Sequence, residues 1–244
     1  MELQAVEEMF RIEDRHWWFQ GKRRVVLGTL DQLLSTLPAG PLLDLGCGTG
    51  RTLREFEQRR RSFGLDADRA CLGYCAERGA RGLARSHGER LPLRDESLAL
   101  VSALDILEHL DDDAASAREI HRVLKPGGVL LASAPAYRFL WSPHDEVLHH
   151  RRRYTRAEFT TLLRSAGFVI ERRFAFNYLL FLPILAVRML RKLLPFGRGS
   201  TDFFLLPRPL NALLRALFEV EWAIDRVLSV PVGVTWIVVA RKAR

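Results

Sequence analysis

The sequence has few cysteines and no long apolar run. Its three cysteines are an odd set, too few for a disulfide framework or a four-ligand zinc site, so we expect a reducing cytoplasmic environment. The longest apolar stretch, 178–187, contains Pro183 and is far shorter than the roughly 20 residues that a membrane-spanning helix needs. The first ten residues are acidic and lack the basic-then-apolar order of a signal peptide. These absences favour a cytoplasmic protein without a membrane span.

Positive charge is concentrated towards the C-terminus. The 244-residue chain has a net charge of +8. Residues 1–150 contain 20 Lys and Arg against 23 Asp and Glu, whereas residues 151–244 contain 17 against 6. A basic surface attracts nucleic acid, an anionic membrane or an anionic substrate, and the charge alone does not choose among them.

Strand-like and helix-like segments alternate along most of the chain. The predicted strands are short apolar runs near 42–45, 62–65, 82–86, 98–103, 129–134, 168–176 and 233–241. The predicted helices between them lie near 50–60, 70–78, 113–124 and 155–166. This alternation predicts an α/β fold with a doubly wound, mostly parallel sheet that has helices on both faces.

Two helical segments depart from this alternation. Residues 1–40 read as one helical segment that ends at a Pro-Ala-Gly-Pro break, and residues 177–232 contain two amphipathic helices. We expect these two helices, 178–194 and 209–230, to form a hairpin inserted between the last two strands. The predicted core then consists of residues 41–176 and a final strand within 233–244.

The clearest motif is a glycine-rich turn after the first strand, Leu42-Leu43-Asp44-Leu45-Gly46-Cys47-Gly48-Thr49-Gly50. Glycines let a backbone approach a ligand closely, and the following helix start offers unpaired N–H donors. The spacing G-x-G-x-G differs from the G-x-G-x-x-G of dinucleotide sites, which makes a dinucleotide the weaker interpretation. Tight packing of strand against helix is the purely structural alternative.

Together with later segments, this turn resembles motif I of class I methyltransferases that use S-adenosylmethionine (SAM), closest to their small-molecule type 11 branch. The later segments that carry the resemblance are Phe63–Asp66, His87–Leu93, Leu98–Leu110 and Arg122–Gly128. The resemblance covers about residues 16 to 176. It implies SAM as the cofactor and a seven-stranded sheet whose last strand is antiparallel.

The resemblance also implies which residues bind the cofactor. Around the turn, the methionine part of SAM is expected to contact Gly46, Cys47, Gly48 and Gly50, with Asp44 ordering the turn or meeting the amino group. The remaining residues expected at the cofactor are Asp66 at the ribose, Ala67 under the adenine, Leu104 and Asp105 in the pocket wall, and Arg23 at the methionine carboxylate.

One expected cofactor position departs from the family pattern. Family members usually carry an acidic residue there for the adenine amino group, and this sequence has His87. An imidazole accepts a hydrogen bond through its unprotonated nitrogen, or the backbone of Gly88 and Glu89 takes the role instead. We therefore predict His87 and Gly88 as cofactor residues.

The N-terminal run His16-Trp17-Trp18-Phe19 resembles a segment of a bacterial subgroup of these enzymes and is expected to fold over the cofactor site. Arg23 or Arg24 would then pair with the methionine carboxylate. The alternative is that the two tryptophans only anchor the first helix to the sheet.

A loop after the fifth strand is the expected acceptor site, because it resembles the H-D-E…H-x-R-R-Y stretch of the same subgroup. His144 or His149 is the expected general base. The residues expected to bind an anionic acceptor are Arg152, Arg153 and Tyr154. A solvated loop with a helix-start ion-pair network is the alternative.

Metal binding is considered at the exit of the fourth strand. Glu108 and His109 are adjacent and could ligate Mg²⁺, but the nearby run Asp111–Asp113 is typical of a helix N-cap. We therefore predict no metal ion.

These residues favour O-methylation of a small hydrophobic or lipid-linked, anionic acceptor. RNA methylation is a second hypothesis, which the basic C-terminal part suggests, but no separate RNA-binding module is visible and we expect no nucleic-acid partner. A SAM-binding scaffold without turnover is a third. The inserted helices are apolar on one side and basic on the other, which fits an anionic membrane surface at the inner face of the membrane, a lid over the site or a homodimer seam.

Overall fold

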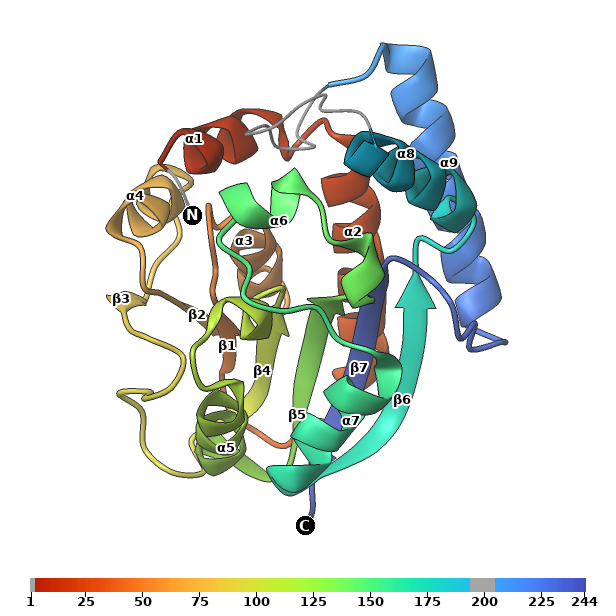
Figure 1. The fold of residues 1–244 in the computed structure, drawn as a ribbon. Helices are drawn as coiled ribbons and strands as arrows, with labels where there is room; N and C mark the ends of the chain where they lie inside the picture. The colour runs from red at the N-terminus through yellow and green to blue at the C-terminus, as the bar shows by residue number, and fades with distance from the viewer. Residues whose placement is uncertain (1–2, 194–204) are drawn as a thin grey trace.

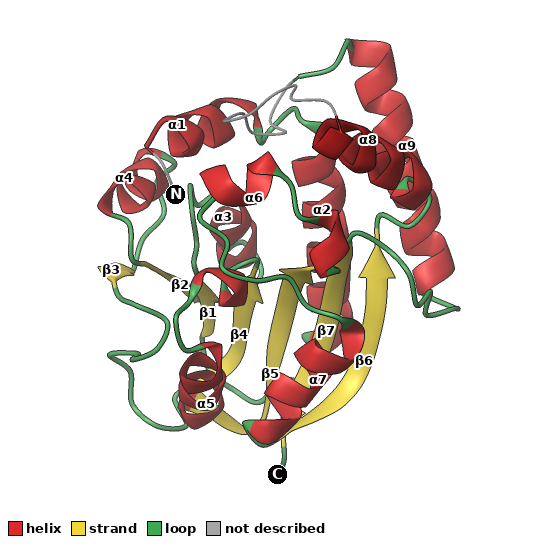
Figure 2. Ribbon diagram, in the orientation of Figure 1, coloured by secondary structure: helices red, strands yellow, loops and turns green. Residues whose placement is uncertain are grey.

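A computed structural model describes residues 3–193 and 205–244, in which seven strands form one mixed sheet between layers of helices (Figures 1 and 2). The strand order is β3-β2-β1-β4-β5-β7-β6. The strands are β1 (Leu42–Leu45), β2 (Ser62–Asp66), β3 (Leu83–Arg85), β4 (Leu98–Leu104), β5 (Leu124–Pro135), β6 (Phe168–Phe176) and β7 (Thr235–Lys242). The predicted α/β fold is confirmed.

The last strand runs against its neighbours, as the resemblance implied. β1, β2, β3, β4 and β5 pair in parallel, whereas β7 lies between β5 and β6 and is antiparallel to both. Trp236 pairs with Ala134 on one side and with Ala175 on the other. The strand predicted near 129–134 begins earlier, at Leu124.

The helices differ from the prediction mainly near the N-terminus. Their bounds are α1 (Leu3–Ile12), α2 (Trp17–Leu33), α3 (Arg51–Glu57), α4 (Arg69–Glu77), α5 (Asp113–Val123), α6 (Pro143–Val147), α7 (Arg156–Ser165), α8 (Phe181–Leu193) and α9 (Arg208–Asp225), with short 3₁₀ turns η1 (Leu107–His109) and η2 (Arg138–Leu140). The single N-terminal helical segment is two helices, because His16 adopts an extended backbone and its side chain accepts a hydrogen bond from the Trp18 N–H at the start of α2.

Two apolar layers cover the sheet. On one face, α5 and α7 bury Ile120 and Phe159 against the sheet, and they lie in front of it in Figure 1. On the other face, α2 and α9 bury Val25, Leu30 and Phe218 against the same strands. The carboxyl ends of β1, β2 and β4 are left between these layers, where α1, α6 and the start of α2 gather above them (Figure 2).

The inserted segment packs α9 along α2. The Phe218 ring lies directly over Gly21, and Trp222 lies over Gly28. Glu221 accepts hydrogen bonds from the Asn177 and Leu179 N–H groups, both at 2.7 Å, and so ties the start of the insertion to α9. Most of the connection expected between the two inserted helices lies at 194–204, outside the described residues. No described helix is both long enough and apolar enough to cross a membrane.

Candidate functional site

The carboxyl ends of β1, β2 and β4 open into one cavity of about 740 Å³. Its wall also includes residues of α1, α2, the segment around α6, and the insertion. In doubly wound sheets, ligands bind outside the carboxyl ends of the strands at the point where the strand order reverses. Here β1 pairs with β2 on one side and with β4 on the other, so the cavity lies at that point.

The glycine-rich turn forms one wall of this cavity. Gly46, Gly48 and Gly50 have φ angles of 71°, 53° and 83°, a region that residues with a Cβ rarely adopt. A Cβ on Gly48 would meet only the Met9 Cε within 4 Å, at 3.5 Å, so this glycine keeps the backbone open to a ligand. Gly46, Cys47 and Gly48 line the cavity.

Gly50 serves a different purpose in the turn. It caps α3 with a left-handed backbone, and a Cβ there would lie 2.8 Å from the Cys75 Sγ. It is not among the residues that line the cavity. Its place in the structure is at the packing contact between α3 and α4.

Two predicted carboxylates lie at the cavity and are tied to the backbone or to a hydroxyl. Asp66 accepts hydrogen bonds from the Gly48 and Asp68 N–H groups, both at 2.9 Å, which leaves lone pairs for further donors. Asp44 is buried and accepts a hydrogen bond from the Ser102 hydroxyl. Burial raises the pKa of Asp44 to about 7 and also raises the pKa of Asp66.

The predicted adenine region is partly assembled at the cavity. Ala67, His87 and Leu104 line it. Gly88 packs instead towards α5, where a Cβ would lie 3.0 Å from Leu110 Cδ1 and 3.2 Å from Ser116 Oγ. Gly88 is therefore not a lining residue, although His87, the residue before it, is.

Asp105 lines the cavity with a strained backbone, at a φ of 52°. Its carboxylate forms an ion pair with Lys22 and accepts a hydrogen bond from the Ser133 hydroxyl at 2.7 Å. Burial alone would raise the pKa of Asp105, but Lys22 and Ser133 hold it below its usual value. No sequence pattern indicated Lys22, since a lysine on a helix is most often solvated.

The N-terminal aromatic run borders the cavity and also packs on the core. Trp17 stacks on Phe218 at 5.2 Å between ring centroids, and Trp18 lies 5.6 Å from Phe176. Arg23 lines the cavity, and burial lowers its pKa. Arg24 instead forms an exposed ion pair with Glu219, so of the two arginines only Arg23 is placed for the predicted role.

Asp145 is the centre of the predicted acceptor loop. Arg153 donates to its two carboxylate oxygens at 2.7 and 3.0 Å, and the His150 Nδ1 lies 2.8 Å away. Burial would raise the pKa of Asp145, but these two partners hold it well below its usual range. Arg153 also donates to the Ala136 carbonyl oxygen. This arginine, which was predicted to bind the methyl acceptor, therefore contacts protein groups at the cavity wall.

A local sequence pattern accounts for the short helix α6 in this loop. Ser142 and Asp145 form a capping box at the start of α6, with Pro143 at its first position. The pattern Ser-x-x-Asp with a proline after the serine is visible in the sequence and predicts such a short helix.

The other predicted residues of the loop differ in position. His144 lines the cavity, whereas His149 is exposed, has a φ of 57° and lies outside the lining. Arg152 forms an ion pair with Asp113 at 2.9 Å, and the Tyr154 hydroxyl donates to the same carboxylate at 2.7 Å. Arg152 and Tyr154 thus fasten the loop to the start of α5, away from the cavity lining.

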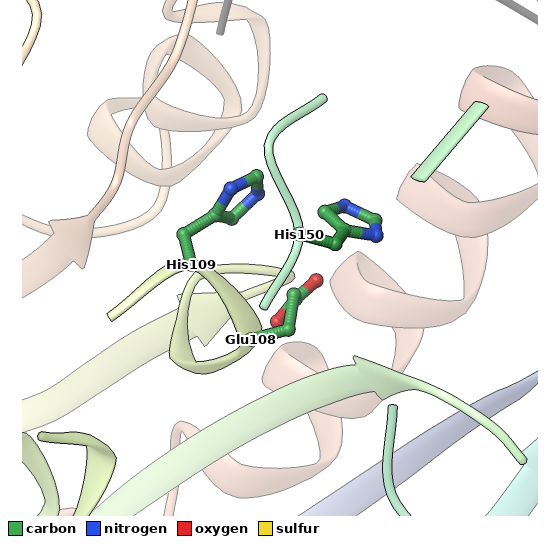
Figure 3. A group of neighbouring side chains, drawn as sticks. All are labelled: Glu108, His109 and His150. Carbon is green, nitrogen blue, oxygen red and sulfur yellow. The ribbon is translucent and has the colours of Figure 1, made fainter. Parts of the chain in front are cut away.

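The structure also brings together three side chains, of which the sequence indicated only two as candidate metal ligands. Figure 3 shows Glu108 and His109, both from η1, beside His150 from the loop after α6. Their ligand-type atoms all lie within 4.8 Å of one another. Burial raises the pKa of Glu108 well above its usual value, and burial together with His150 lowers the pKa of His109 to about 4.

Comparisons with known proteins agree with this geometry. Residues 43–132 match the family described as a methyltransferase domain. The chain is 38% identical over 167 residues to a probable S-adenosylmethionine-dependent methyltransferase of Mycolicibacterium smegmatis, an alignment that covers 66% of this chain and 62% of that protein. It is 33% identical over 104 residues to the malonyl-[acyl-carrier protein] O-methyltransferase of Serratia marcescens, covering 42% of this chain and 41% of that enzyme.

A solved structure covers more of the chain. It is the complex between the Haloferax volcanii Trm112 methyltransferase activator and a methyltransferase, and the match has a TM-score of 0.61 at 21% identity. It covers 99% of this chain and 95% of the matched one, which supports the fold. The chain spans less than two thirds of the length of the curated relatives named above.

Proposed function

We propose that this chain, which carries a SAM-dependent methyltransferase domain, methylates an oxygen atom of an acceptor that has an apolar part. One observation carries the proposal. A single cavity joins the glycine-rich turn of the cofactor motif to apolar side chains of the insertion. A cofactor at the turn and an acceptor beneath the insertion would therefore share one enclosed space.

The cofactor end of the cavity fits SAM. The backbone at Gly48 borders open space that a Cβ would occupy. The Asp66 carboxylate beside it has lone pairs left for hydroxyl donors. Arg23 is the cation placed to meet the carboxylate of the methionine part. When bound, SAM supplies a methyl group on a positively charged sulfur, which is an electrophile.

The acceptor end offers groups that could position an oxygen nucleophile. His144 and Asp105 line the same cavity, with Asp105 kept ionised by Lys22. An acceptor hydroxyl needs a base to remove its proton, and His144 is the proposed base. An acceptor carboxylate is already ionised near neutral pH and needs only orientation and exclusion of water.

The apolar part of the acceptor is proposed to lie against the insertion. The lining residues contributed by this part of the chain are mainly apolar: Leu180, Pro183, Ile184, Val187, Leu206 and Leu214. Burying such a surface against an acyl chain or ring gains roughly 25 cal/mol per Å² of apolar area. Among the relatives, the Serratia marcescens protein is named an O-methyltransferase, which supports oxygen as the acceptor atom.

The test is transfer of a labelled methyl group. The full chain is incubated with methyl-labelled SAM in three separate reactions. These contain a bacterial lipid extract, a mixture of medium-chain carboxylic acids, or total RNA. We expect label in the organic phase with the first or second mixture. Alkaline treatment that releases labelled methanol would identify a methyl ester, and alkali-stable label would point to an ether or an N-methyl product.

Asp66→Ala is the control, because it removes the proposed ribose acceptor and should abolish transfer. Label in the RNA alone would replace this proposal with RNA methylation. Tight SAM binding without transfer to any mixture would instead favour a SAM-binding protein without turnover.

A further inference from the structure

The Glu108 side chain stands out in the cavity wall. It is 0% exposed, and neither of its carboxylate oxygens has a hydrogen-bond partner among the described residues. Native proteins rarely bury a carboxyl group without partners, because its desolvation is then uncompensated. Such a group, at the wall of a cavity, points to a ligand that pairs with it.

Two imidazoles lie beside the Glu108 carboxylate, and the cations Lys22 and Arg153 also act on it electrostatically. Figure 3 shows the rings of His109 and His150 on either side of its carboxylate, and the ligand-type atoms of all three residues lie within 4.8 Å of one another. One carboxylate and two imidazoles form a donor set suited to Zn²⁺, Fe²⁺ and similar ions. Mg²⁺ prefers oxygen ligands throughout, so this set is not a typical magnesium site.

The protein also orients one of the two imidazoles. The His150 Nδ1 lies 2.8 Å from Asp145, so an Nδ1–H donated to that carboxylate leaves Nε2 with a free lone pair. Arg153 holds Asp145 in place from the other side. A carboxylate behind a ligating histidine is the usual support of metal sites, where it fixes the tautomer and the ring.

The two segments that supply the side chains are fastened to each other. The Arg151 N–H donates to the Glu108 carbonyl oxygen at 2.8 Å, and the Arg151 Nε donates to the His109 carbonyl oxygen at 2.9 Å. The three side chains are therefore held on a braced backbone, and binding of Zn²⁺ requires their ligand atoms to move to roughly 2.0–2.2 Å from the ion.

We propose that Glu108, His109 and His150 bind one divalent transition-metal ion of the zinc class at the cavity wall. Three protein ligands leave coordination positions open, as in catalytic zinc sites. These positions face the cavity that the proposed function assigns to the acceptor, so the ion would hold an acceptor oxygen there; this second step rests on the proposed function. The binding site itself does not.

The test measures metal binding without SAM or acceptor. The full chain is stripped with a chelator and titrated with Zn²⁺ by calorimetry and with Co²⁺ by visible absorption. We expect one equivalent of either ion to bind, and Glu108→Gln and His150→Ala each to weaken binding at least about tenfold. His121→Ala is the matched control, because it removes a histidine that packs on Phe168, outside the cavity lining, and should leave the affinity unchanged.

Binding of S-adenosylhomocysteine, the demethylated product, to each variant would show that the fold is intact. Absence of metal binding by the wild type would overturn the proposal, as would unchanged affinity in both Glu108→Gln and His150→Ala. A failure of methyl transfer would leave this result untouched, since the titration contains no methyl donor.

Discussion

Lys22 on α2 forms an ion pair with Asp105 at the end of β4, so the N-terminal helices are joined to the sheet at the cavity wall. The lysine side chain is buried to a large extent, and the Asp105 side chain is 33% exposed. The pair holds Asp105 ionised at a position whose backbone has a φ of 52°. The ion pair therefore contributes to the stability of the fold and also fixes the position of Asp105 at the cavity wall.

We predict that Lys22→Met lowers the free energy of unfolding by about 1–3 kcal/mol, because it leaves the Asp105 carboxylate in a largely enclosed position without its cation. Urea denaturation measures the change. Adding Asp105→Asn to this variant should restore part of the loss, since the unpaired charge is then gone. Equal stability of Lys22→Met and wild type would mean that solvent screens this pair completely.

Asp66→Ala should weaken the binding of S-adenosylhomocysteine at least about tenfold, because the variant loses both the proposed ribose contact and the acceptor of the Gly48 N–H. Calorimetric titration gives the affinity. Asp95→Asn is the control, since this side chain is 73% exposed and pairs only with Arg122 among its described contacts. Wild-type affinity in Asp66→Ala would place the ribose elsewhere.

Two glycines on helices should respond oppositely to alanine. A Cβ on Gly21 would lie 2.0 Å from the Phe218 ring, so Gly21→Ala forces α9 away from α2 and should destabilise the protein by roughly 1–3 kcal/mol. Gly73 on α4 has nothing within 4 Å of a Cβ, and Gly73→Ala should stabilise by about 0.5–1 kcal/mol. Thermal unfolding compares them, and a stabilising Gly21→Ala would contradict the packing of α9 on α2.

Asp225 should make stability fall as the pH rises. Burial, and then the neighbouring Glu221, raise its pKa from 3.8 to about 7, against smaller opposing effects of the Val230 backbone and of Arg172. Between these values the folded protein holds a proton that the unfolded chain has lost, so the free energy of unfolding decreases across this window. Asp225→Asn does not ionise, and it should be more stable than wild type above pH 7.

Urea denaturation at several pH values tests this difference. The two proteins should approach the same stability near the acidic end of the window, where Asp225 is protonated in both states. A difference that does not change with pH would show that the substitution acts through packing rather than through the charge.

The insertion is predicted to contact anionic membranes. Leu182 and Leu190 on α8 are 71% and 55% exposed, and α9 adds the exposed Arg208 and Arg215. Apolar and basic side chains together suit an anionic lipid surface. The protein should sediment with vesicles that contain phosphatidylglycerol, and the double substitution Leu182→Glu with Leu190→Glu should abolish this binding.

Val169→Glu is the control for that measurement, because Val169 is an exposed apolar residue on β6, outside the insertion. Binding that survives the double substitution, or that is insensitive to salt, would argue against the insertion as the contact. A concentration-dependent dimer that the double substitution dissociates would point to the homodimer seam instead.

The strands and the glycine-rich turn could be predicted because their signals are local. An apolar run such as 98–103 is buried on both faces wherever a parallel sheet forms, and the turn at 46–50 requires glycines for its backbone angles. The break before α2 is also encoded locally, in the capping side chain of His16, but the apolar periodicity on both sides concealed it.

The site residues also differ in whether a local sequence pattern could place them. Positions at or next to the carboxyl end of a strand, such as Asp44, Asp66 and Asp105, could be placed at the cavity from the sequence, because the carboxyl ends of parallel strands meet at one edge. Lys22 could not, since the direction of a helical side chain depends on how the helix packs on the sheet.

The sequence by itself determined the α/β fold and the position of the cofactor turn, because apolar periodicity and glycine backbone angles act over a few residues. Only the tertiary structure decided which of the adjacent His149 and His150 faces the cavity. That choice depends on a hydrogen bond to the buried Asp145, and on the contact of this loop with Glu108, some forty positions earlier in the chain. Such long-range contacts follow from packing, which no local pattern contains.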